Sequence, residues 1–222
     1  MDAIGFDLYG TLVDPLSMQD HLRGVAGDRA GEVAALWRTK QVEYAFRRGL
    51  METWTTFEVC TAQALAYAAG AAGIALTDGD RDALLAAYRR LPLFPEVRAA
   101  LATLRHGGRR VVAFSNGSAA VVRELLGHAG ALDLLDDVVS VDEVRTFKPH
   151  PSVYRRLAER VAKPPGETWL VSGNAWDVLG AKSAGLRAAW VRRSPSSLFD
   201  PWGVEPDLTV ANLRELAAAM PG

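Results

Sequence analysis

Polar side chains with catalytic potential follow four apolar stretches of this chain, at the points where those stretches end. Two are carboxylates, one is an ammonium group, and the others are hydroxyls or amides, which together could form an active site if they shared one cleft. If the stretches are strands of one parallel sheet, their carboxyl ends meet at one edge. The residues are Asp7, Thr11, Ser115, Asn116, Lys148, Ser172, Asn174 and Asp177.

Each of these residues has an ordinary structural explanation when it is taken alone. An aspartate such as Asp7 at a strand end is often a turn former or a helix cap, and residues 115–117 (SNG) are typical of a turn. Lys148 precedes a proline in a segment typical of surface loops, and Asn174 suits the cap of a following helix. Their repetition at successive strand ends is what favours a common site.

The elements that must position these residues alternate between strands and helices along most of the chain. Apolar and β-branched runs predict strands at 3–8, 110–114, 137–140, 168–171, 188–191 and 208–210. Helical spacing predicts helices at 96–105, 119–126, 151–161 and 175–184. This alternation indicates an α/β fold with a parallel sheet that helices cover on both faces.

Residues from about 18 to 90 interrupt this pattern with an all-helical insertion. They carry little strand signal, and alanine, leucine and charged residues recur at helical spacing. The predicted helices run over residues 33–46, 54–69 and 80–90. Thr53 and Asp78 are the candidate caps of the second and third helices.

The composition is that of an ordinary globular chain of 222 residues. A formal charge of −1 gives no electrostatic basis for binding nucleic acid or an anionic membrane. The single cysteine, Cys60, lies in an apolar helical pattern, where burial is expected. No apolar run reaches the length of about 18 residues that a membrane span needs, and no basic segment of a signal peptide opens the chain. We therefore expect a cytoplasmic protein.

Four ordered motifs give the chain a resemblance to the haloacid dehalogenase superfamily. They are residues 6–14 (FDLYGTLVD), 115–118 (SNGS), 148–154 (KPHPSVY) and 171–177 (VSGNAWD). The resemblance covers nearly the whole chain and implies a Rossmann-like parallel sheet core with a helical cap domain inserted after the first strand. The expected core comprises residues 1–14 and 93–222, and the expected cap comprises residues 15–92.

Two departures separate the chain from the magnesium-dependent phosphotransferases that make up most of this superfamily. Phosphatases carry a second aspartate two residues after the nucleophile, whereas Tyr9 stands there in this chain, and a phenol is no equivalent acid near neutral pH. They also carry a metal-binding aspartate in the last motif, where this chain has Gly173. Because magnesium prefers carboxylate oxygens, we expect no metal and no other cofactor.

Three further segments resemble the L-2-haloacid dehalogenase branch. Residues 36–44 (LWRTKQVEY) are similar to its cap helix, with Arg38 in the place of its halide-binding arginine. Residues 141–145 (VDEVR) precede the motif lysine as they do in that branch, and residues 174–177 (NAWD) match its last motif. Gly173 departs from the serine that is common there, and we expect this departure to have little effect on chemistry.

The resemblance implies hydrolysis of short-chain (S)-2-haloalkanoic acids to (R)-2-hydroxyalkanoic acids and halide. Asp7 attacks carbon 2 on the side opposite the halogen and forms an ester, and Thr11 orients it. Lys148 stabilises the charge of the nucleophile, and Arg38 receives the halide.

Water then attacks the ester and releases the hydroxy acid. Asp177 is the candidate for activating this water, with help from Asn174 and Ser172. The alternative is that Asp177 is only a structural partner of Lys148. Tyr154 is expected to support the Lys148 loop.

The resemblance also implies contacts for the substrate. Ser115, Asn116 and neighbouring backbone amides suit its carboxylate. Candidates for an apolar cradle around the alkyl group and the halogen are Tyr9, Val42, Phe57 and Trp176. Core packing explains Val42 and Phe57 equally well. A homodimer is implied too, and burial of the apolar cap helices within one chain is the alternative.

Two rival functions remain open. A phosphatase of the same superfamily would hydrolyse phosphate monoesters with magnesium, and a non-catalytic binding module would release neither phosphate nor halide. The module is disfavoured because every charged position of the catalytic set is filled. A serine hydrolase has little support, because the sequence contains no Gly-X-Ser-X-Gly elbow.

Overall fold

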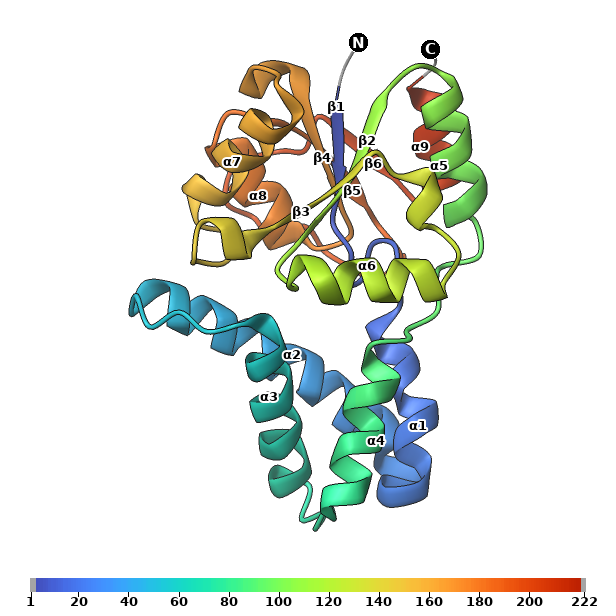
Figure 1. Ribbon diagram of the computed structural model, residues 1–222, viewed down its shortest axis with the longest axis vertical. Helices are drawn as coiled ribbons and strands as arrows, with labels where there is room; N and C mark the ends of the chain where they lie inside the picture. Colours follow the sequence, from blue (N-terminus) through green and yellow to red (C-terminus); the bar gives the residue numbers. More distant parts are fainter. Residues whose placement is uncertain (1–2, 221–222) are drawn as a thin grey trace.

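The computed structural model describes residues 3–220, and a parallel sheet of six strands forms its centre (Figure 1). The strands are β1 (Ala3–Phe6), β2 (Arg110–Ser115), β3 (Asp137–Ser140), β4 (Thr168–Ser172), β5 (Arg187–Val191) and β6 (Leu208–Val210). Their order is β3-β2-β1-β4-β5-β6, and all neighbouring pairs are parallel. The predicted α/β, Rossmann-like fold is confirmed.

Helices cover both faces of this sheet. In Figure 1, α7 (Pro151–Val161) and α8 (Ala175–Ser183) lie on one side of it, and α5 (Val97–His106) and α9 (Leu213–Ala219) lie on the other. α6 (Ala119–His128) packs against β3. Because the central strands face helices on both sides, every residue of β1 and β4 is buried. Short 3-10 helices lie at Pro15–Ser17, Gly27–Arg29, Leu132–Leu134, Val141–Glu143 and Pro165–Glu167.

Between β1 and α5 the chain leaves the sheet and forms the helical cap. Its α-helices are α1 (Met18–Ala26), α2 (Ala30–Leu50), α3 (Phe57–Ala71) and α4 (Asp78–Tyr88). The cap lies beyond the carboxyl ends of the strands, as Figure 1 shows. The position of the cap after the first strand is therefore as predicted.

The two connections between core and cap run side by side. The Asp14 N–H donates to the Pro92 carbonyl at 3.1 Å, and the Phe94 N–H donates to the Leu12 carbonyl at 3.0 Å. These bonds support our proposal that the cap comprises residues 15–92 and the core comprises residues 1–14 and 93–222.

Both predicted helix caps in this region are wrong. α3 begins after Thr56, because the Thr53 N–H donates at 3.1 Å to a carbonyl in the last turn of α2 and so closes that helix. α4 is capped by Thr77 and not by Asp78: Thr77 Oγ1 accepts from the Asp80 N–H at 3.1 Å, and Asp80 Oδ2 accepts from the Thr77 N–H at 3.0 Å. This reciprocal pair satisfies two donors that helix hydrogen bonding leaves free.

The sequence does not predict α1 or α9. Each is short and buries few apolar side chains: α1 buries Met18 and Leu22, and α9 buries Leu213 and Leu216. Two buried positions give too weak a period to identify a helix. Among the helices of residues 3–220, none combines the length and the apolar character that crossing a membrane requires.

Candidate active site

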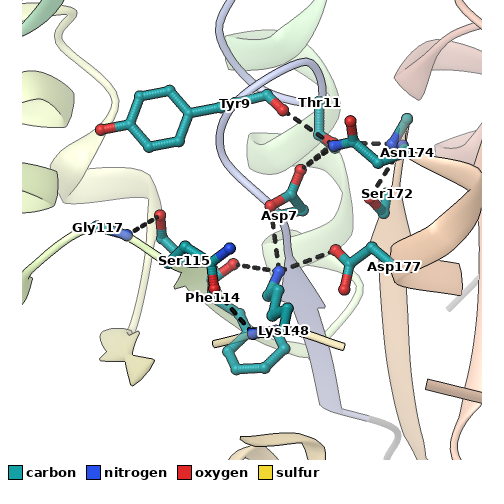
Figure 2. Close-up of polar contacts among 12 residues, drawn as sticks. Asp7, Tyr9, Thr11, Phe114, Ser115, Gly117, Lys148, Ser172, Asn174 and Asp177 are labelled. Atoms are coloured by element: carbon teal, nitrogen blue, oxygen red, sulfur yellow. Dashed lines mark hydrogen bonds and ion pairs between the residues drawn. The ribbon is translucent and has the colours of Figure 1, made fainter. Parts of the chain in front are cut away.

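The carboxyl ends of β1, β2 and β4 lie at the edge of the sheet that faces the cap. Asp7 follows β1 directly, Ser115 ends β2, and Ser172 ends β4. The chain leaves β1 toward β2 on one side, while β4 and its successors lie on the other. Crevices at such a switch point are the usual ligand sites of open parallel sheets. The structure thus brings together residues that are far apart in the sequence (Figure 2).

Both carboxylate oxygens of Asp7 are held by donors. Oδ1 accepts from Lys148 Nζ at 3.1 Å, and Oδ2 accepts from Thr11 Oγ1 and from Asn174 Nδ2, each at 2.8 Å. The Asp7 N–H donates to the Val171 carbonyl at 2.9 Å, which ties the backbone to β4. With its side chain only 7% exposed, Asp7 has one fixed orientation and little contact with water.

Lys148 is fully buried between two carboxylates. Its Nζ donates to Asp7 Oδ1, to Asp177 Oδ2 at 2.9 Å and to the Phe114 carbonyl at 2.9 Å, so each ammonium proton has an acceptor. The Phe114 ring centroid lies 4.1 Å from Nζ, close enough for a cation–π contact. The Lys148–Pro149 peptide bond is cis. Because Lys148 is fully buried, the explanation of this residue as part of a surface loop is wrong.

Asp177 is also fully buried. Its Oδ2 binds Lys148, and its Oδ1 accepts from Tyr154 Oη at 2.7 Å. Burial raises the pKa of the Asp177 carboxyl, and the charge of Asp7 adds to this, while Lys148 opposes both. Burial and then Asp177 raise the pKa of Tyr154 well above its ordinary value, so its hydroxyl remains a donor. Tyr154 therefore supports Lys148 through Asp177.

The loop after β1 fixes Thr11. Thr11 Oγ1 donates to Asp7 and accepts from the Gly173 N–H at 2.8 Å. Gly10 has a φ of +87°, which glycine adopts without strain. A Cβ on Gly173 would lie 2.2 Å from the Gly10 carbonyl oxygen, so this loop has no room for a side chain at residue 173.

Asn174 stands at the N-cap position of α8, yet its side chain makes no capping bond. Asn174 Nδ2 instead donates to Asp7 Oδ2 and, at 3.0 Å, to the Tyr9 carbonyl. The capping explanation of Asn174 is thus wrong, because the side chain is directed toward Asp7, as Figure 2 shows.

Three further predicted residues shape the turns around the site. Ser115 Oγ accepts from the Gly117 N–H at 3.0 Å, and Ser172 Oγ accepts from the Asn174 N–H at 3.1 Å. Asn116 Oδ1 accepts from the Lys148 N–H at 3.0 Å. Ser115, Ser172 and Asn116 are buried, so they hold the backbone of the crevice in place.

Arg38 reaches from α2 into the core. Its Nη2 donates to the Tyr9 carbonyl at 3.1 Å and lies 3.5 Å from Asn174 Oδ1, and its Nη1 donates to Gln41 Oε1 at 2.8 Å. All three acceptors are uncharged, and no carboxylate within residues 3–220 forms an ion pair with Arg38. Arg38 is therefore held at the boundary of cap and core, and its charge is available to an anion.

The predicted cradle residues are divided between two places. The rings of Tyr9 and Phe57 lie with centroids 5.5 Å apart and border a cavity of about 410 Å³ between α3, α4 and α6. Trp176 meets Phe46 of α2 edge to face at 4.9 Å. Val42 is half-buried on α2.

A match over most of the chain identifies its family. Residues 1–185 fit the model of the haloacid dehalogenase-like hydrolases. The chain belongs to this family. It is 38% identical over 210 residues to haloacetate dehalogenase H-2 of Moraxella sp. strain B, covering 95% of this chain and 93% of that protein. It is 36% identical over 214 residues to (S)-2-haloacid dehalogenase 2 of Pseudomonas sp. strain CBS-3, with coverage of 96% and 93%.

A solved structure of the same family is also similar to this chain. The L-2-haloacid dehalogenase of Xanthobacter autotrophicus with chloropropionic acid covalently bound superimposes on this chain with a TM-score of 0.91. The two are 31% identical, and the superposition covers 98% of this chain and 97% of that one. The predicted resemblance to the L-2-haloacid dehalogenase branch is confirmed.

Sequence reasoning missed two residues of this hydrolase that touch the site. Gln41 accepts from Arg38, and Tyr88 Oη donates to the same Gln41 oxygen at 2.9 Å. The spacing of Arg38 and Gln41, three apart on one helix, could have indicated that they share a face. No local spacing connects Tyr88, at the end of α4, to α2. Within residues 3–220, no three His, Cys, Asp or Glu side chains converge as metal ligands would.

Proposed function

We propose that this hydrolase converts short-chain (S)-2-haloalkanoic acids to (R)-2-hydroxyalkanoic acids and halide through an ester on Asp7. One observation carries the proposal. An aspartate whose two oxygens are held by Lys148, Thr11 and Asn174 lies beside a guanidinium, that of Arg38, that has no carboxylate partner within residues 3–220. A fixed nucleophile and an available cation are the two requirements of displacing halide from saturated carbon.

The first step is backside attack by Asp7 on carbon 2. Oδ2 already accepts two hydrogen bonds and Oδ1 accepts one, so Oδ1 keeps a lone pair for the attack. The bond from Oδ1 to carbon 2 forms as the carbon–halogen bond breaks, and the bonding pair leaves with the halide. Arg38 stabilises the charge that develops on the halide, while Ser115, Asn116 and neighbouring backbone amides bind the substrate carboxylate.

In the second step water attacks the carbonyl carbon of the Asp7 ester. Asp177 takes a proton from this water, and Asn174 and Ser172 help to position it. The bond between the Asp7 carbonyl carbon and Oδ1 breaks, and the leaving alkoxide takes up the proton from Asp177. The carbon 2–oxygen bond formed in the first step is retained in the product. One displacement at carbon 2 therefore inverts its configuration.

Isotope transfer from heavy-oxygen water tests this route. After many turnovers, peptide mass analysis should find the label in Asp7, because the second step returns one water oxygen to its carboxylate. In a single turnover, the hydroxy acid should carry no label. The Asp7→Asn variant should release no halide while its circular dichroism stays native. An unlabelled Asp7 after many turnovers, with active enzyme, would rule the ester out.

The proposed reaction uses no metal. The ammonium of Lys148 lies between the carboxylates of Asp7 and Asp177, and the close approach of Gly10 leaves no room for a carboxylate at residue 173. Halide release should therefore persist after treatment with a chelator. Magnesium-stimulated hydrolysis of a phosphate monoester, with no halide release from 2-chloropropionate, would instead support the phosphatase alternative.

We also propose a cytoplasmic location and a homodimer. The reduced, buried Cys60 suits a compartment that keeps thiols reduced. Exposed apolar side chains on the cap, Leu50, Met51 and Tyr67, support a subunit interface there. A monomeric mass in sedimentation equilibrium would contradict the dimer.

A further inference from the structure

Gln41 is a fully buried amide at the point where three cap helices meet. Its Oε1 accepts from Arg38 Nη1 at 2.8 Å and from Tyr88 Oη at 2.9 Å, and its Nε2 donates to Thr61 Oγ1 at 2.6 Å. Arg38 and Gln41 belong to α2, Thr61 to α3 and Tyr88 to α4. A buried polar group with this many partners holds one orientation.

The hydrogen bonds fix which end of the amide faces Arg38. Thr61 has one hydroxyl proton, and it is donated to the Phe57 carbonyl at 2.8 Å. Thr61 Oγ1 must therefore accept from Gln41, and only the amide nitrogen can donate to it. The carbonyl oxygen of Gln41 is left to face Arg38 and Tyr88. Burial raises the pKa of Tyr88, so its hydroxyl stays protonated and donates to the same oxygen.

We propose that Gln41 is a positioning residue of the halide site: it holds the Arg38 guanidinium in place without neutralising its charge. This inference rests on the proposed role of Arg38 as the group that receives the halide. An arginine side chain has many rotamers, and a carboxylate is a partner whose geometry matches its planar guanidinium. A carboxylate at residue 41 would neutralise the cation that the halide needs. A neutral amide fixes the guanidinium and leaves its charge available.

The other acceptors of Arg38 follow the same pattern. The Tyr9 carbonyl and the Asn174 side-chain oxygen are both uncharged. These two acceptors belong to the core, whereas Gln41 belongs to the cap. Gln41 is thus the group that sets the position of Arg38 from the cap side. Because Gln41 bonds to side chains of α3 and α4, the packing of these helices against α2 determines where the guanidinium lies.

Two substitutions separate position from charge. Gln41→Glu keeps the size of the side chain and adds a negative charge next to Arg38. Gln41→Met keeps a similar length and removes the hydrogen bonds without adding charge. Gln63→Glu is the matched control, because Gln63 accepts from another arginine, Arg48, at 3.0 Å on the exposed face of α3. All four proteins are compared with and without substrate.

The first measurement is the equilibrium affinity for bromide, which calorimetry determines in the absence of substrate. We expect bromide affinity to fall in the order wild type, Gln41→Met, Gln41→Glu, with a loss of about tenfold or more in the last, because a carboxylate next to the guanidinium repels the anion. Gln63→Glu should bind bromide like the wild type. The larger loss in Gln41→Glu than in Gln41→Met measures the effect of the added charge, since both variants lose the amide donor to Thr61.

The second measurement is turnover of 2-chloropropionate and 2-bromopropionate. Because chloride is the poorer leaving group, kcat should fall more for the chloro acid than for the bromo acid in both Gln41 variants. Equal bromide affinity in wild type and Gln41→Glu would overturn the role of Gln41, whatever the turnover. So would a bromide affinity in Gln41→Met that equals that of the wild type.

The two measurements also separate this inference from the proposed function. If bromide binding depends on residue 41 as expected but no halide is released from any 2-haloacid, Gln41 positions an anion site and the proposed reaction is wrong. If the wild type does not bind bromide at all, the role of Arg38 and the role of Gln41 are both wrong.

Discussion

Lys148 and Arg38 have different electrostatic roles in the site. The Lys148 ammonium is fully buried, and its three protons are donated to two carboxylates and a carbonyl, so it has no capacity for another anion. Arg38 meets only uncharged acceptors. An anion that forms at the substrate is therefore stabilised by Arg38, while Lys148 serves the two aspartates.

Gly173 is the residue where the shape of the site is most restricted. In Gly173→Ala the new Cβ would lie 2.2 Å from the Gly10 carbonyl oxygen, so the backbone must move. This movement would weaken the bond from the Gly173 N–H to Thr11 Oγ1 and thus disturb Thr11 at Asp7. We expect the free energy of unfolding to fall by about 1–3 kcal/mol and kcat for halide release to fall by about 10²-fold, measured by urea unfolding and chloride release.

The matched control for this prediction is Gly166→Ala. A Cβ on Gly166 meets nothing within 4 Å, so this variant should match the wild type in both measurements. Wild-type stability and activity in Gly173→Ala would mean that the loop after β1 can move aside without affecting Asp7.

At the scale of elements, the sequence predicts strands and their ends better than it predicts helix ends and packing. Asp7 and Ser115 are found at strand ends because a buried parallel strand is an apolar run that stops abruptly. Thr53 fails as a helix cap because a threonine can equally close one helix as open the next. Gln41 could not be recognised, since the contact with Thr61 depends on how α2 and α3 pack and not on local spacing.

The contact between α3 and the core should make stability depend on pH. Glu58 accepts at 3.0 Å from both the N–H and the hydroxyl of Ser118. Burial raises the pKa of the nearby Asp142, and the charge of Glu58 raises it further; Asp142 Oδ1 has no hydrogen-bond partner in the described part of the chain. A carboxyl whose pKa is higher in the folded state destabilises the fold once pH rises above its ordinary value.

Asp142→Asn removes this ionisation and keeps the side-chain shape. The variant should therefore gain stability over the wild type as pH rises from its ordinary value of 3.8 toward neutrality, and the gain should vanish in more acidic solution. Urea unfolding at a series of pH values measures the difference. A difference that is constant across the series would exclude an ionisation at residue 142 as its cause.

Asp207→Asn provides a control of opposite sign. Burial acts to raise the pKa of Asp207, but hydrogen bonds from Lys182 and from the Ala188 N–H outweigh it, and the pKa is lowered. A lowered pKa contributes stability above the ordinary value, and this contribution is lost as pH falls through the folded-state pKa. This variant should have a lower free energy of unfolding than the wild type at neutral pH, and the difference should disappear in acid.

At the scale of the whole molecule, cap and core together enclose Asp7. Arg38 joins the two through the Tyr9 carbonyl, Phe46 joins them through Trp176, and Glu58 joins them through Ser118. One cavity of about 410 Å³ is bordered by Tyr9, and a second of about 330 Å³ is bordered by Phe46 and Lys148. Among the described residues, neither wall includes Asp7, so a substrate must displace part of this boundary to reach it.

We expect the cavity beside Tyr9 to be the route of the substrate, because Tyr9 on its wall follows Asp7 closely in the chain and the Tyr9 carbonyl accepts from Arg38. Ala86→Trp, on the wall of this cavity, should lower kcat/KM for 2-chloropropionate by about tenfold, equivalent to about 1.4 kcal/mol, and lower kcat much less. Ala83→Trp, exposed on the same helix and away from that wall, is the control. The loss should be smaller for chloroacetate than for 2-chlorobutyrate, since a smaller acid passes a narrowed passage more easily. If both tryptophan variants keep the wild-type kcat/KM in steady-state assays, the substrate reaches Asp7 elsewhere, and Leu50→Trp at the second cavity becomes the variant that should slow it.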